Sequence, residues 1–256
     1  MKAHDKVLID SLPPIEVAPN VDGCHLPLRS EIKSQLEFLY EKSDLNLEEP
    51  VYVIPGIDAT RATNRESVTV FSIKTVSTGT CIGIVGAVAG GDHYENMAKS
   101  ATPFLRQVEE LVMNPIITTA IGNVQITVRI GGDLSNLYDL LGLGKATGKY
   151  SCPCCILPKD QFFLPAIDVD TYNACNDATL GRTMANIQNE AKKSSNRAFS
   201  VKNPPLTRVP VDPTELIVNW IMLCLLHATM RLCGTCTNYL LLYGQGSKLD
   251  KVGKKK

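Results

Sequence analysis

Two aspartates in this chain, Asp58 and Asp133, are candidate ligands for metal ions that could promote cleavage of a phosphodiester bond. Asp58 follows a short apolar run at 51–54 and a Pro-Gly pair that is expected to end that strand. Asp133 follows the alternating segment 123–130, which is also expected to be a strand. If these strands are parallel neighbours, both carboxylates project from one edge of the sheet. Carboxylates held together repel each other unless a cation lies between them, and hard oxygen ligands favour Mg²⁺ or Mn²⁺.

Each aspartate taken alone has an ordinary structural explanation. Asp133 follows a Gly-Gly pair and precedes a helical pattern, where aspartate is a common N-cap. Asp58 lies in a predicted turn that contains glycine, and Asp92 has the capping position of another predicted helix. Only the joint placement of Asp58 and Asp133 favours a metal site over capping and turn formation.

The segment that must position these acids, residues 46–144, has the pattern of an α/β fold. Three strand-like runs are followed by a helix, a fourth strand and a second helix. This β-β-β-α-β-α order is that of an RNase H-like core, here incomplete. The expected elements span residues 51–54, 67–76, 81–89, 92–113, 123–130 and 133–142. Residues 1–45 are predicted to be an irregular lead-in with one short helix at 30–42.

The pattern becomes irregular after residue 144. Residues 145–210 are expected to form a Cys-containing and basic linker or insertion, 211–243 a long apolar helix and 244–256 a basic tail, so that the C-terminal region as a whole is expected to be mainly helical. The apolar helix is long enough to span a bilayer, but Arg231 near its centre would be costly there. We therefore expect a buried helix, with a membrane tail anchor as the less favoured alternative.

The nine cysteines suggest thiols or metal ligands, because residues 1–17 do not have the pattern of a secretory signal. Cys152 and Cys155 have zinc-knuckle spacing, and Cys233 and Cys236 supply a second pair that could complete a four-cysteine Zn²⁺ site. The second pair lies in an apolar stretch, where cysteines are often small core residues. The protein is expected in the nucleus or cytoplasm and is not expected to be secreted.

Positive charge is concentrated locally rather than globally. The chain has 26 Lys and Arg against 26 Asp and Glu, so no net field attracts a polyanion. Residues 191–208, however, contain five cations and no acid. We predict DNA phosphate contacts from Lys192, Lys193, Arg197 and Lys202. A solvated loop without a partner is the alternative explanation of this run.

Together these motifs resemble the RAG-like DDE transposases, the family that includes the catalytic subunit of V(D)J recombinase. The resemblance covers residues 51–243 and includes Gly-Ile-Asp-Ala at 56–59, Asp-His-Tyr-Glu at 92–95, Gly-Gly-Asp at 131–133 and Tyr-Ser-Cys at 150–152. It implies metal-dependent DNA strand cleavage and transfer, with the two aspartates as the first acids of the catalytic triad. The first motif departs from the family form, because its acid follows Gly-Ile rather than Gly alone.

The resemblance also implies features that this chain lacks. The family has a late glutamate as third acid, but no Asp or Glu occurs between Glu215 and Asp250. The family's zinc site uses two downstream histidines, and only His227 follows His93. The expected protein is therefore a truncated or degenerate relative, inactive alone, that acts as a homodimer or with a missing C-terminal half. A domesticated non-catalytic module that binds nucleic acid or protein is the second hypothesis.

Overall fold

The computed structural model describes residues 16–17, 23–61, 67–91, 93–144, 148–158, 174 and 176–223. The chain divides into two compact units, Met1–Met222 and Leu223–Lys256, and the described residues lie almost entirely in the first. Asp92, Cys233, Cys236, His227 and the predicted basic tail lie outside the described ranges, as does most of the predicted apolar helix.

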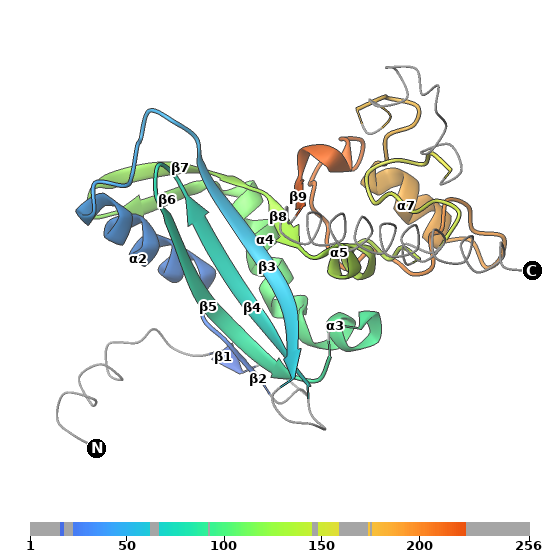
Figure 1. Cartoon of the computed structure of the whole chain (residues 1–256), viewed down its shortest axis with the longest axis horizontal. Coiled ribbons are helices and arrows are strands. Elements are labelled where there is room, and N and C mark those ends of the chain that lie inside the picture. The colour runs from blue at the N-terminus through green and yellow to red at the C-terminus, as the bar shows by residue number, and fades with distance from the viewer. Residues whose placement is uncertain are drawn as a thin grey trace, which may run out of the picture. The chain divides into compact units, whose positions relative to one another are not determined.

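The first unit is a mixed α/β structure built on one strongly curled sheet (Figure 1). The sheet has the strand order β1-β2-β5-β4-β3-β7-β6. Adjacent strands are antiparallel except β3 and β7, which are parallel. The strands are β1 (Glu16–Val17), β2 (Gly23–His25), β3 (Val51–Arg61), β4 (Ser67–Val76), β5 (Thr80–Ala89), β6 (Ile116–Thr119) and β7 (Gly122–Val128).

Two helices cover one face of the sheet and form the main core with it. They are α2 (Leu28–Glu41) and α4 (Thr102–Met113), which follows the short helix α3 (Tyr94–Ser100). Side chains alternate between the faces of a strand. In β4, Phe71 is fully buried while the next residue, Ser72, is partly exposed. The Phe71 ring lies 4.9 Å from that of Phe104 in α4, between ring centroids.

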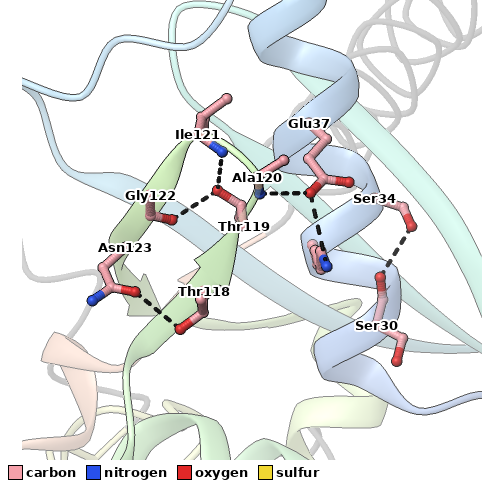
Figure 2. A network of polar contacts seen from close by, with 10 residues as sticks. Ser30, Ser34, Glu37, Thr118, Thr119, Ala120, Ile121, Gly122 and Asn123 are labelled. Carbon is pink, nitrogen blue, oxygen red and sulfur yellow. Dashed lines mark hydrogen bonds and ion pairs between the residues drawn. The ribbon is translucent and has the colours of Figure 1, made fainter.

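Polar contacts fasten the β6–β7 turn to α2 (Figure 2). The Ala120 N–H donates to Oε1 of Glu37 in α2 at 3.0 Å. Within the turn, Thr119 Oγ1 donates to the Gly122 carbonyl at 2.8 Å and accepts from the Ile121 N–H at 3.2 Å. The edge of the sheet is therefore held by the same helix that covers its buried face.

Beyond β7 the chain forms smaller elements. These are β8 (Ile130–Gly132), α5 (Leu134–Leu140), α7 (Met184–Ala191), the 3₁₀ turn η2 (Ile217–Asn219) and β9 (Ile221–Leu223), with β8 and β9 paired in a second sheet. Buried side chains of α5 and α7 pack together with Val201 and Ile217 in a second hydrophobic cluster.

The predicted strand at 51–54 was too short, because β3 continues through Pro55 and Gly56 to Arg61. The carbonyl of Val53 faces β7, where it accepts from the Arg129 N–H at 2.9 Å. Backbone groups of alternate residues face the same side of an antiparallel strand. The missing N–H of Pro55 therefore faces that side too, so proline removes no hydrogen bond from the β3–β4 ladder.

Two helix predictions also need correction. The predicted helix at 92–113 is split into α3 and α4, since Pro103 lies in the first turn of α4 and has no N–H to continue a preceding helix. The predicted helix at 211–243 does not begin in the described part: residues 211–216 form turns, and η2 and β9 follow. There the Trp220 carbonyl accepts from the Ile130 N–H at 2.7 Å, a tertiary pairing that a local apolar pattern cannot show.

The described residues of the expected mainly helical C-terminal region lie mostly in turns and loops. α7 is the α-helix within 148–158, 174 and 176–210. The short helix predicted at 30–42 is confirmed as α2, which begins two residues earlier. In the described part of the chain, no helix has the length and apolar character needed to cross a bilayer.

Candidate functional site

Asp58 lies within β3 rather than after it. It pairs with Val70 of β4. Its side chain is exposed, whereas that of the preceding Ile57 is buried against Phe104 and Val108 of α4. Because successive side chains of a strand point to opposite faces, Asp58 points away from the helix-covered face.

Asp133 is the N-cap of α5, as its place after the Gly-Gly pair predicts. Its Oδ1 accepts from the Asn136 N–H at 2.7 Å, and its backbone is extended, as an N-cap requires. Within the described residues, its second carboxylate oxygen takes part in no hydrogen bond or ion pair. Capping therefore uses one oxygen of Asp133 and leaves the other for a ligand.

Contacts between β3 and the segment β8–α5 bring the stretches of chain that carry the two acids side by side. After β7 the chain continues beside β3, and β8 lies against it (Figure 1). A β-carbon built on Gly131 would lie 2.5 Å from Cγ2 of Ile54, and one built on Gly132 would lie 3.9 Å from the Ile57 carbonyl oxygen. Asp58 follows Ile57 and Asp133 follows Gly132. We call this contact, Ile57–Asp58 against Gly132–Asp133, the acid junction.

The negative charges at the acid junction have no compensating protein cation in the described part of the chain. Neither Asp58 nor Asp133 forms an ion pair there; the ion pairs that are seen join Lys33 to Glu37 and Lys193 to Glu190. Asn136, which is 1% exposed, has a buried Oδ1 that accepts no hydrogen bond from the described residues. Carboxylate and amide oxygens are ligands that suit a hard divalent cation, so these residues are the candidates for such a site.

The acid junction is incomplete as a metal centre. Among the described residues, no group of three or more His, Cys, Asp or Glu side chains gathers where a metal ion could be held. Mg²⁺ commonly keeps several waters and binds through one or two carboxylates. Two acids could therefore bind the cation, but a two-metal site with three acids is not formed by this part of the chain.

The predicted zinc knuckle is held by an arginine that sequence patterns did not reveal. Arg182 is 1% exposed, and its Nε donates to the carbonyls of Cys152 and Cys155, both at 3.0 Å. Its Nη2 donates to the Phe199 carbonyl at 2.8 Å. The Arg182 guanidinium therefore joins the cysteine turn to a loop more than forty residues later in the chain.

Electrostatics in this turn are dominated by the buried cation. Burial lowers the pKa of Arg182, and negative charge on Cys152, Cys155, Cys154 and Tyr138 would oppose that shift. The Cys154 N–H donates to Cys152 Sγ at 3.3 Å. No third ligand for Zn²⁺ gathers here among the described residues. Zinc at Cys152 and Cys155 therefore stays a prediction.

The four predicted phosphate-binding cations are all exposed on one loop, but two of them also maintain its shape. Lys193 pairs with Glu190 at 2.5 Å. Arg197 donates from Nε to the Lys193 carbonyl at 2.9 Å and from Nη1 to the Lys202 carbonyl. The hydrogen bond from Lys193, and then that from the Ala198 N–H, lowers the pKa of Glu190. Lys192 and Lys202 extend the same exposed basic surface.

Comparison with known proteins assigns this chain to no family. No family model matches the chain, and no curated protein matches its sequence. Function must therefore be inferred from the acid junction, the cysteine turn and the basic loop.

Proposed function

We propose that this unit is the first half of an RNase H-like core of the RAG-like DDE transposase type, with Asp58 and Asp133 as ligands of Mg²⁺ or Mn²⁺. Its support in the fold is the strand order β5-β4-β3-β7, with β3 and β7 parallel and the other pairs antiparallel. The chain passes from β5 to β7 through α3, α4 and the short edge strand β6. A core of this type requires its first and fourth strands to be parallel neighbours.

The observation that carries the proposal is the acid junction. Asp58 and Asp133 are 75 positions apart in the chain, yet the Ile57 carbonyl before Asp58 accepts a hydrogen bond from Nδ2 of Asn136, whose backbone N–H is capped by Asp133. Either aspartate alone would be explained by its position in a strand or at a helix N-terminus. A divalent cation at the acid junction would compensate their charges, for which the described residues supply no ion-pair partner.

When bound, the cation would activate a water or hydroxyl and stabilise the leaving oxygen of a phosphodiester. In this chain Asp58 and Asp133 would supply the charge that holds it, and Asp133 would do so with the oxygen that does not cap α5. The sequence between Glu215 and Asp250 contains no acid for the third position. We therefore propose that the chain binds the cation but cleaves DNA only if another chain or segment supplies the third carboxylate.

Cation binding tests this proposal without requiring catalysis. Titration of Mn²⁺ into the full chain, followed by calorimetry, should give one site that weakens at least tenfold in Asp58→Asn and in Asp133→Asn, because each removes one of two charged ligands. Asparagine is also a good N-cap, so Asp133→Asn should retain α5. Asp212→Asn is the matched control, since Asp212 is an exposed aspartate whose Oδ1 caps a turn by accepting from Thr214.

Unchanged Mn²⁺ affinity in both site variants, or no binding by the wild-type chain, would remove the metal-site proposal. A parallel assay with supercoiled plasmid and Mn²⁺ should show no nicking by the wild-type chain alone. Nicking by the wild-type chain that Asp133→Asn abolishes would show that the catalytic site is more complete than we propose.

The exposed basic loop supports a second function, sequence-independent nucleic-acid binding without catalysis. If Lys192 and Lys202 contact phosphates, changing both to Glu should reduce the slope of log affinity against log salt by about 2, because each phosphate contact contributes about 0.9. Fluorescence anisotropy with a labelled duplex between low and moderate salt measures this slope. An unchanged slope would mean that the loop is a solvated surface without DNA contact.

A further inference from the structure

Asn136 makes the hydrogen bonds that join the two halves of the acid junction. Its backbone N–H donates to Asp133 Oδ1 at 2.7 Å. Its side-chain Nδ2 donates to the Ile57 carbonyl oxygen at 2.6 Å, across 79 positions of sequence. That carbonyl belongs to the peptide bond that leads into Asp58. One residue is therefore bonded to the carboxylate of the second acid and to the backbone next to the first.

Burial makes this pair of contacts rigid. Asn136 is 1% exposed, and a hydrogen bond in such a site is stronger than one in water. Among the described residues, β7 itself pairs with β3 only from Val51 to Val53, so the regular ladder ends before it reaches Ile57. Beyond the end of this ladder, the hydrogen bond from the Asn136 amide to the Ile57 carbonyl joins the two segments.

We infer that Asn136 is a positioning residue for the cation site, setting the separation of Asp58 and Asp133 and holding them together against their mutual repulsion. This inference rests on the proposed metal site at the acid junction. Residues that hydrogen-bond to the ligands of a metal, without contacting the metal themselves, commonly raise metal affinity tenfold or more.

The test separates metal affinity from folding stability. Asn136→Leu retains the approximate shape of the side chain and removes both polar atoms, while the backbone N–H that donates to Asp133 Oδ1 remains. We expect Mn²⁺ affinity of the full chain to fall about tenfold, as for other groups that support metal ligands. Thr119→Val is the matched control: it removes another largely buried side-chain donor from a backbone carbonyl, in the β6–β7 turn at the opposite end of β7. It should leave Mn²⁺ affinity unchanged.

A second readout needs no metal. In metal-free protein Asp58→Asn relieves repulsion between the acids, so it should raise the urea midpoint of unfolding. In the Asn136→Leu background the acids are free to separate, and the same substitution should raise the midpoint by less than half as much. If Asp58→Asn changes the urea midpoint equally in the wild-type and Asn136→Leu backgrounds, the positioning role is refuted.

The outcomes distinguish the positioning role from the metal site itself. If Asp58→Asn and Asp133→Asn weaken Mn²⁺ binding while Asn136→Leu binds as the wild type does, the positioning role is refuted and the metal site stands. If the wild-type chain does not bind Mn²⁺, the metal site is refuted, and the urea cycle alone then decides whether Asn136 holds the acids together. Loss of affinity in Asn136→Leu with retention in Thr119→Val supports the inference.

Discussion

Gly131 offers a direct way to open the acid junction by adding one methyl group. A β-carbon at this position would lie 2.5 Å from Cγ2 of Ile54 and 3.6 Å from the Pro55 carbonyl oxygen. Cγ2 is attached directly to the branched β-carbon of Ile54, so it cannot move away without a change of rotamer. Gly131→Ala must therefore either force Ile54 into another rotamer or push β8 away from β3.

The expected change in the free energy of unfolding of Gly131→Ala results from two opposing effects. Overpacking of this kind costs about 1–3 kcal/mol. Replacing glycine by alanine at a position that needs no special backbone conformation stabilises the folded state by about 0.4–1 kcal/mol. The net loss in the free energy of unfolding should be about 1–2 kcal/mol, together with weaker Mn²⁺ binding, because Asp133 moves with β8.

A compensating substitution makes this prediction specific. In the double variant Gly131→Ala with Ile54→Ala, the obstructing methyl group is absent, so the two costs should not add. The coupling should recover about 1 kcal/mol, within the range for residues in contact. Urea unfolding followed by fluorescence of Trp220, the single tryptophan, measures all four proteins. Additive losses, or a Gly131→Ala variant as stable as the wild type, would refute the contact between β8 and β3.

Two further predictions concern the core and the basic loop. Phe71→Ala should lower the free energy of unfolding by about 3–5 kcal/mol, whereas Phe38→Ala, at a side chain that is 47% exposed, should cost far less; calorimetry that finds equal losses would contradict the core assignment. Since the pKa of Glu190 is lowered in the folded state, its contacts stabilise the loop above the unfolded pKa of about 4.3 and are lost as pH falls through the folded value. The Ala198 amide resonance should follow this titration in the wild type and not in Glu190→Gln.

Local sequence patterns predicted several elements because a local physical cause determined each of them. The alternation of β-branched residues at 67–76 matches β4, which has one buried and one partly exposed face. The Gly-Gly-Asp motif predicted the cap of α5, since aspartate satisfies the first amides of a helix. The strand expected at 123–130 ends instead at Val128, and the two glycines lie in β8. The parallel pairing of β3 with β7 agrees with the expected parallel neighbours, whereas Asp58, expected just past a strand end, lies within β3.

Other features depend on contacts that are distant in sequence. Pro55 looked like a strand end, yet β3 passes through it because its missing N–H faces away from β4. Arg182 gave no signal, because nothing in its neighbours indicates that carbonyls of Cys152, Cys155 and Phe199 surround it. Asn136 looked like an ordinary polar residue of a helix's first turn; only the approach of Ile57 shows its second contact.

The most direct measurement is the position of Mn²⁺ in crystals of this chain, located by its anomalous scattering. We predict one peak in contact with the carboxylates of both Asp58 and Asp133, with metal–oxygen distances of about 2.0–2.2 Å, as for hard cations in oxygen sites, and carboxyl groups within about 6 Å of each other. A peak located elsewhere, or two carboxylates that point into separate regions, would contradict the proposed cation site.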